Sequence, residues 1–194
     1  MTLTPSTMLE LGTKAPDFSL NTADGKPFTL AEQSIDKGLL VIFMCNHCPY
    51  VKHIRKKLVE KIRDYQSRGI TVVAINSNDY EAHPDDSPEK MLEEAKTFAY
   101  SFPYLVDSDQ RVARSYRAAC TPDLFLFDGS HRLVYRGQFD AARPGNDRDV
   151  TGADLSGAVD ALVSGLQIPT EQIPSMGCNI KWKPGNEPEY FAKA

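Results

Sequence analysis

Two cysteines three positions apart are the most reactive groups in the sequence. Cys45 and Cys48 enclose Asn46 and His47, and they directly follow a run of apolar residues. A thiolate at such a position can attack a disulfide or a peroxide, and a second thiol three residues away can reach the mixed disulfide that forms. The spacing therefore predicts thiol redox chemistry, with Cys48 as the nucleophile and Cys45 as the resolving thiol.

The residues after Cys48 favour its ionised form. Pro49 suits the first position of a helix, which makes Cys48 the N-cap residue. Its sulfur would then face unpaired backbone N–H groups and the positive end of the helix dipole. Lys52 lies one turn further on, within a basic stretch. Each effect is expected to lower the pKa of the Cys48 thiol.

Other roles for this cysteine turn stay open. Zinc or copper could bind here, because both metals accept thiolate and imidazole ligands. The candidate ligands are Cys45, His47 and Cys48, joined by Cys120, Cys178 or His53. The cysteines could also be small buried residues that only fill space. His47 could act as an acid or base beside the sulfur, or it could be an exposed loop residue.

Hydrophobic periodicity predicts the elements that position this turn. Residues 38–44 form a continuous apolar run, typical of a buried parallel strand. Apolar residues at helical spacing predict a helix over 51–65 that ends at Arg68 and Gly69. Residues 70–75 predict the next buried strand. In this strand–helix–strand unit the cysteines lie at the carboxyl end of a parallel strand, where ligand chemistry is expected.

The flanking segments predict a mixed sheet that is parallel in the middle and covered by helices. We expect two hairpins, at Asp24-Gly25 and at Asp128-Gly129. Three further helices are expected, two starting at Ser87-Pro88 and Ser108-Asp109 and one over Leu155–Leu166. Polar loops are expected over Asn76–Asp86 and Asp140–Val150. The predicted fold class is α/β. We expect a single domain over 1–194, with a core at about 11–166 and a tail at 167–194.

Length and charge exclude several classes of protein. The chain has 194 residues, of which 22 are basic and 26 are acidic, and its net charge is −4. This balance argues against a nucleic-acid partner. No apolar run approaches the roughly 20 residues of a membrane helix. The first 16 residues lack a signal-peptide pattern, so we expect a cytoplasmic protein, without a membrane partner, whose four cysteines are reduced.

The segment Cys120-Thr121-Pro122 completes a pattern that resembles the thioredoxin fold. Its parts are an apolar strand, a cysteine at a helix N-terminus, and a later X-Pro just before an antiparallel strand. The resemblance implies that Pro122 is cis and that its loop faces Cys48. Thr121 would then offer its backbone to a substrate chain. Cys120 would be either a resolving thiol or a small buried residue.

The N-terminal residues are similar to the alkyl hydroperoxide reductase/thiol-specific antioxidant superfamily. The similarity lies in Gly12-Thr13-Lys14-Ala15-Pro16-Asp17-Phe18-Ser19-Leu20 and Asp24-Gly25-Lys26-Pro27-Phe28-Thr29-Leu30. The peroxiredoxin pattern Pro-x-x-x-Thr-x-x-Cys is incomplete, because Val41 and Cys45 replace Pro and Thr when Cys48 is the peroxidatic residue. The combination resembles a peroxiredoxin-like subgroup of redoxins.

This resemblance implies an antioxidant thiol oxidoreductase that needs no cofactor. Its partners would be a disulfide-containing protein or a peroxide as substrate and a thiol as electron donor, with a homodimer as one possible assembly. Disulfide reduction is the first prediction, and peroxide reduction and a metal-binding or regulatory role are the alternatives. Peroxiredoxin relatives often keep a resolving cysteine near the C-terminus, so Cys178 could form a disulfide with Cys48 or Cys45. Alternatively, the segment around Cys178 only covers a sheet face.

Overall fold

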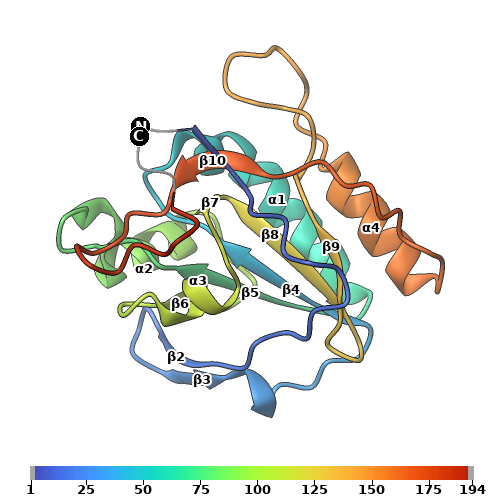
Figure 1. The fold of residues 1–194 in the computed structure, drawn as a ribbon, viewed down its shortest axis with the longest axis horizontal. Helices are drawn as coiled ribbons and strands as arrows, with labels where there is room; N and C mark the ends of the chain where they lie inside the picture. Colours follow the sequence, from blue (N-terminus) through green and yellow to red (C-terminus); the bar gives the residue numbers. More distant parts are fainter. Residues whose placement is uncertain (1–2, 192–194) are drawn as a thin grey trace.

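A mixed sheet of seven strands forms the centre of the computed structural model, which describes residues 3–191 (Figure 1). The strands are β2 (Ser19–Thr22), β3 (Pro27–Thr29), β4 (Gly38–Phe43), β5 (Ile70–Asn76), β6 (Tyr104–Val106), β8 (Asp123–Asp128) and β9 (Leu133–Arg136). Their order is β3-β2-β6-β5-β4-β8-β9. The central β4, β5 and β6 are parallel, and β8 pairs antiparallel with β4. The sheet is therefore mixed, as predicted.

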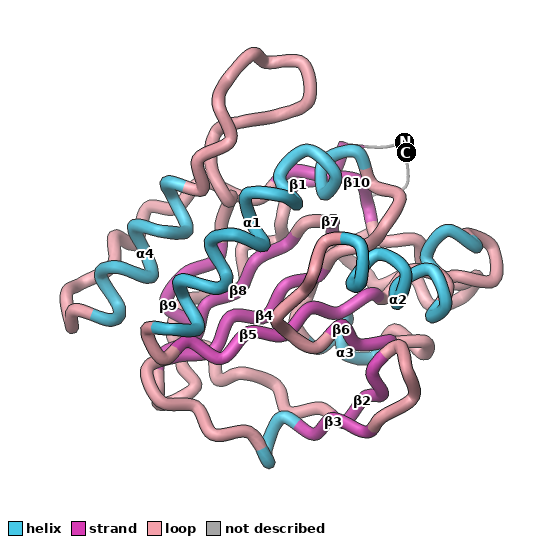
Figure 2. The backbone as a smooth tube through the Cα atoms, turned by 180° about the vertical axis from the view of Figure 1, so that it is seen from behind, coloured by secondary structure: helices cyan, strands magenta, loops and turns pink. Residues whose placement is uncertain are grey.

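Helices cover both faces of this sheet. α1 (Pro49–Ser67), α2 (Pro88–Thr97) and α4 (Ala153–Val163) pack on one face (Figure 2), and the short α3 (Arg111–Ser115) packs on the other. Alternate residues of β4 serve the two cores: Leu40 packs with the residues of α1, whereas Val41 packs with those of α3. The α/β fold class, with a central sheet flanked by helices, is confirmed.

A second, smaller sheet lies beside the cysteine turn. It contains β1 (Leu3–Pro5), β10 (Met176–Asn179) and β7 (Cys120–Thr121) in the order β1-β10-β7, with antiparallel pairing throughout. The periodicity of the sequence predicts none of these strands, because each has four residues or fewer. Through β10, the predicted tail returns to the residues just before Pro122.

Two sequence predictions need correction. The segment expected as a loop over Asn76–Asp86 contains the 3-10 helix η2 (Pro84–Asp86), and η1 (Leu30–Glu32) is a second such turn. The helix expected from Ser108-Asp109 begins only at Arg111. The reason is Asp107, whose buried carboxylate accepts hydrogen bonds from the N–H groups of Val112 and Ala113. These N–H groups lie in the first turn of the helix and have no acceptor within it.

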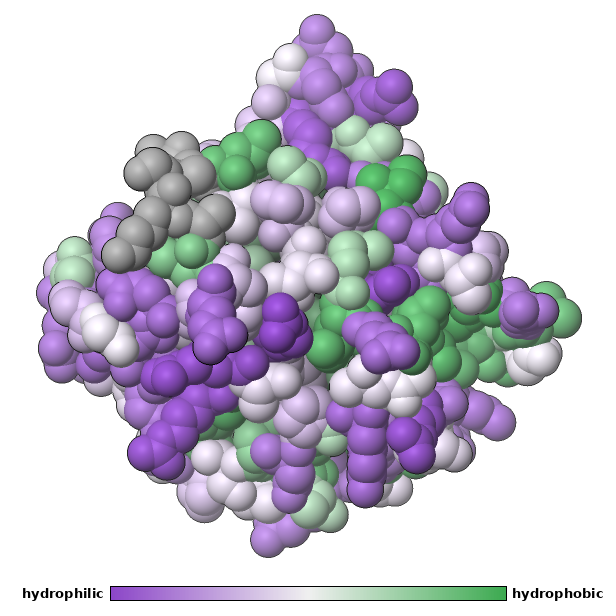
Figure 3. Space-filling model, in the orientation of Figure 1, coloured by the Kyte–Doolittle hydropathy of each residue, from purple (hydrophilic) through white to green (hydrophobic). Residues whose placement is uncertain are grey.

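The polar loop before α4 matches its prediction. Residues 145–149 are exposed, and the space-filling view shows a hydrophilic protrusion there (Figure 3). Among the described residues, no helix is long and apolar enough to span a membrane.

Candidate active site

Cys48 lies where β4 and α1 meet, in the position that the sequence predicts. It is the N-cap residue of α1, and Pro49 occupies the first helical turn. Its side chain is fully buried, and Sγ lies 3.1 Å from the carbonyl oxygen of Thr121. In the thiol form Cys48 donates to this carbonyl. In the thiolate form, the N–H of Val51 in the first turn stabilises the charge.

Two other thiols converge on the Cys48 sulfur. Hydrogen bonds from Cys178 and then from Cys45 lower the pKa of Cys48 far below its ordinary value, and they outweigh the effect of burial. The same hydrogen bonds, together with burial, raise the pKa of Cys45 and of Cys178. The three sulfurs thus favour one thiolate, on Cys48, flanked by two protonated thiols.

The proline loop closes this cluster from the opposite side. The Thr121–Pro122 peptide bond is cis, as the resemblance to the thioredoxin fold implies. Thr121 contacts both cysteines of the turn, because its carbonyl oxygen faces Cys48 and its Oγ1 lies 3.4 Å from Cys45 Sγ. Thr121 and Pro122 therefore belong to the same site as Cys45 and Cys48.

Cys120 takes no part in this cluster of hydrogen bonds. Its fully buried thiol donates to the carbonyl of Pro122, at 3.5 Å. Burial, the largest cause, raises its pKa well above the ordinary value. The geometry favours the interpretation of Cys120 as a small buried residue over that of a resolving thiol.

A buried carboxylate supports the turn from behind. Asp86, in η2, accepts the backbone N–H of Asn46 at 2.8 Å and the side-chain amide of Asn78 at 2.7 Å. It also lies 2.7 Å from Nδ1 of His47, which is half-buried and not an exposed loop residue. Asp86 raises the pKa of His47, and His47 together with Asn78 keeps the pKa of Asp86 low despite its burial.

Comparison with known proteins places this arrangement in a family. Residues 11–136 match the AhpC/TSA family, which is more than half of the chain. The chain belongs to the AhpC/TSA family. The thiol chemistry of this family agrees with the cysteine cluster, so the protein has a thiol-based redox function.

Relatives of this AhpC/TSA protein carry two kinds of redox name. Thiol-disulfide oxidoreductase ResA of Geobacillus thermodenitrificans (strain NG80-2) is 27% identical over 130 residues, 67% of this chain and 70% of the relative. MT2597 of Mycobacterium tuberculosis (strain CDC 1551 / Oshkosh), named as a candidate peroxiredoxin, is 27% identical over 116 residues, 60% of this chain and 69% of the relative. The two names do not agree on disulfide or peroxide reduction.

A solved structure extends the similarity to nearly the full chain. The hypothetical protein SMc02350 of Sinorhizobium meliloti 1021 is 54% identical, with a TM-score of 0.92 over 94% of this chain and 100% of that one. Because 94% of the chain is covered, the similarity extends well beyond residues 11–136, which match the family.

The AhpC/TSA protein also brings together three potential metal ligands. Cys45, His47 and Asp86 offer ligand atoms that all lie within 4.8 Å of one another. The sequence predicts Cys45, His47 and Cys48 as ligands, whereas in this set Asp86 stands in the place of Cys48. Asn46, Asn78 and His47 already hydrogen-bond to the two carboxylate oxygens of Asp86. The Asp86 carboxylate therefore needs no metal ion to satisfy its hydrogen-bonding capacity.

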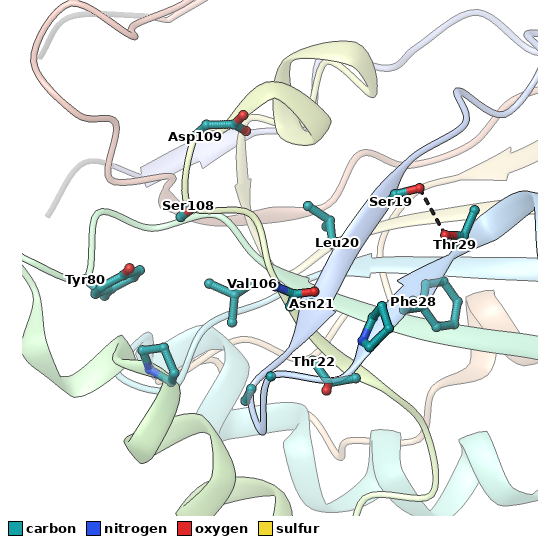
Figure 4. Close-up of a pocket in the computed structure, with 14 residues that line it drawn as sticks. Ser19, Leu20, Asn21, Thr22, Phe28, Thr29, Tyr80, Val106, Ser108 and Asp109 are labelled. Atoms are coloured by element: carbon teal, nitrogen blue, oxygen red, sulfur yellow. Dashed lines mark hydrogen bonds between the residues drawn. The ribbon is translucent and has the colours of Figure 1, made fainter.

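One hollow of the protein lies away from the cysteines. It has a volume of about 520 Å³ and opens between β2 and the loop after β6, where Asn21, Tyr80 and Asp109 line it (Figure 4). No cysteine lines this hollow. This hollow is therefore not part of the cysteine cluster.

One buried acid near the proline loop gives a testable pH dependence. Asp123 follows Pro122, its carboxylate accepts the N–H of Ala119 at 3.2 Å, and burial raises its pKa to about 7. The folded state therefore binds a proton more tightly than the unfolded chain does. Asp123 should make the free energy of unfolding fall as the pH rises from about 4 to about 7, because the charged form is penalised only in the folded protein.

Replacing Asp123 with asparagine should remove this fall. Urea unfolding at a series of pH values would measure it, and the exposed Asp149→Asn would serve as the matched control. An Asp123→Asn variant with the same pH dependence as the parent protein would contradict the assignment.

Proposed function

We propose that Cys48 is the attacking thiolate of a thiol-dependent oxidoreductase, with Cys45 as the first resolving thiol. One observation carries the proposal: a single sulfur, at the start of α1, accepts hydrogen bonds from two other thiols. Such an arrangement makes Cys48 the group that is deprotonated at neutral pH. The name of the ResA relative supports disulfide reduction as the reaction.

The reaction would run in three balanced steps. The Cys48 thiolate attacks one sulfur of the substrate disulfide, a new S–S bond forms, and the other substrate sulfur leaves as a thiolate that takes up a proton. Cys45, once deprotonated, attacks the Cys48 sulfur and releases the second substrate thiol. An external dithiol then reduces the Cys45–Cys48 disulfide and becomes oxidised itself.

Cys178 is the second thiol within reach, so the identity of the resolving residue needs its own test. Mass spectrometry of the oxidised protein would identify the disulfide. We expect a disulfide between Cys45 and Cys48, because both residues lie in the short segment between β4 and α1 and only this segment would have to rearrange. A disulfide between Cys48 and Cys178 would instead link the start of α1 to β10. A bond between Cys48 and Cys178 would assign the resolving role to Cys178.

Peroxide reduction is the second candidate, and the peroxiredoxin name of MT2597 supports it. In that reaction the same thiolate would take an oxygen from the peroxide, forming a sulfenic acid and releasing water or an alcohol. Turnover of hydroxyethyl disulfide against turnover of hydrogen peroxide, both with dithiothreitol as the donor, would separate the two reactions.

The ionisation of Cys48 can be measured directly. Because neighbouring thiols lower its pKa, alkylation of Cys48 by iodoacetamide should reach half its maximal rate at a pH well below the ordinary thiol value. Mass spectrometry would identify the labelled residue. Cys120 is the internal control, since burial raises its pKa. A Cys48 midpoint at or above the value of a free cysteine would refute the thiolate assignment.

A further inference from the structure

The strand β7 places its backbone against the sulfur of Cys48. Thr121, one of its two residues, places its carbonyl oxygen 3.1 Å from Cys48 Sγ. An extended polypeptide that added a strand to a free edge of β7 would bring its own side chains to this sulfur. Such an edge would be a natural docking strand for a polypeptide disulfide.

In the folded protein, β10 already occupies this edge. Cys178 pairs with Thr121 and Asn179 pairs with Cys120 in antiparallel register, and the N–H of Ile180 donates to Ala119 at 3.1 Å. On its other side β10 is paired with β1. Neither edge of β10 is therefore free in the part of the chain that the structure describes.

Glycine at position 177 makes this close approach possible. A Cβ atom there would lie 1.9 Å from the carbonyl oxygen of Thr121 and 3.2 Å from the nitrogen of Pro122. Any other residue would force the two strands apart, because both neighbouring atoms belong to the backbone. The sequence thus allows β10 to lie directly on the cis-proline peptide.

We propose that β10 takes the place of a polypeptide substrate at β7, so that Cys48 reduces small disulfides and excludes polypeptide disulfides while β10 is bound. The inference rests on the proposed role of Cys48 as the nucleophile. It adds the substrate class and the segment that determines it.

One surface hollow reaches the two residues between the cysteines. It has a volume of about 310 Å³ and is lined among others by Asn46, His47 and Lys52, but by no cysteine and by no residue of β7 or β10. A small disulfide could approach the turn from this side without displacing β10. A polypeptide that needs strand pairing with β7 could not, because the edge is already filled.

The test compares two disulfides on a protein in which Cys48 reacts alone. In a Cys45→Ser Cys178→Ser background no second thiol of the cluster can resolve the mixed disulfide, so its formation at Cys48 is a single event. Mass spectrometry would follow this event with hydroxyethyl disulfide and with a ten-residue peptide dimerised through one central cysteine. Each rate is divided by the rate at which free glutathione reacts with the same disulfide. This normalised rate removes the difference in intrinsic reactivity between the two disulfides.

Gly177→Ala in this background should release β10 from β7. We expect the normalised rate with the peptide disulfide to rise roughly tenfold or more, and the rate with hydroxyethyl disulfide to change by less than about threefold. Hydrogen exchange at the amide of Ile180 reports the release of β10, since that N–H bonds to Ala119. Gly157→Ala is the matched control, because a Cβ atom there meets nothing within 4 Å.

A milder variant protects the test against misfolding. Ser175→Ala removes only the hydrogen bond from Ser175 Oγ to the carbonyl of Gly137, at 2.6 Å, and should shift the peptide rate in the same direction by a smaller factor. The inference would be overturned if the two disulfides had equal normalised rates in the background protein, in which β10 is still paired with β7. An unchanged peptide rate once hydrogen exchange shows β10 released would also overturn it. Failure of the protein with Cys45 and Cys178 intact to turn over hydroxyethyl disulfide would instead overturn the proposed function.

Discussion

Replacing Cys48 with serine should abolish disulfide and peroxide turnover. Serine matches cysteine in shape, so the N-cap of α1 should persist, but a hydroxyl does not ionise near neutral pH and attacks sulfur poorly. We expect the rate with either substrate to fall by at least about three orders of magnitude. Steady-state assays with hydroxyethyl disulfide and hydrogen peroxide would measure the loss, with circular dichroism as the check on folding.

The matched control is Cys120→Ser, which changes another buried thiol close to the same loop. Because the Cys120 thiol donates to Pro122 and not to Cys48, this variant should keep most of the activity. Full turnover by the Cys48→Ser protein would remove Cys48 from the nucleophile role. Loss of activity in both variants, with normal folding, would point to a general sensitivity of the loop.

Replacing Asp86 with asparagine should strongly destabilise the protein. The change removes a fully buried charge that holds His47, Asn78 and the backbone of Asn46. An amide in its place presents N–H groups to donors that already lack an alternative acceptor. Breaking one partner of a buried ion pair costs about 3–5 kcal/mol. The loss would be measured by urea unfolding, and the exposed Asp85→Asn is the neighbouring control.

The pH dependence gives this second prediction a sharper form. The raised pKa of His47 adds stability below its unfolded value near 6.5, and this contribution is lost as the pH rises through the folded pKa. The lowered pKa of Asp86 adds stability above 3.8 that is lost as the pH falls. The effect of Asp86→Asn should therefore be larger at about pH 5.5 than at about pH 9. An equal loss at both values would contradict an ionic pair.

The same network connects stability with the chemistry of the site. The hydrogen bond to Asp86 is the largest cause that raises the pKa of His47, and the charge on Cys48 raises it further. Asp86 contacts the cysteine turn through Asn46 and His47, the two residues between the cysteines. We expect Asp86→Asn to shift the alkylation midpoint of Cys48 to higher pH as well.

Local pattern alone was sufficient to predict the position of the cysteine turn between β4 and α1. The apolar run before Cys45, the proline after Cys48 and the helical spacing beyond it are neighbours in sequence. They act through short-range physics: strand burial, N-capping and the helix dipole. The cis peptide at Pro122 was implied by resemblance to the thioredoxin fold, and the structure confirms it.

Only the tertiary structure brings Asp86 and Cys178 to that turn. Asp86 lies in a polar segment between β5 and α2, and nothing in its spacing distinguishes it from the neighbouring Asp85. β10 has four residues, no apolar alternation and a glycine, so periodicity cannot reveal it. Its conformation is set by backbone pairing with β1 and β7, across separations of more than fifty residues. The sequence by itself determined that Cys48 lies at the start of α1, which is the basis for predicting it as the reactive sulfur. Long-range packing decided which groups surround that sulfur and that β10 covers the edge of β7 beside it. Such contacts join residues far apart in the chain, so they depend on the closure of long loops and not on local conformational preference.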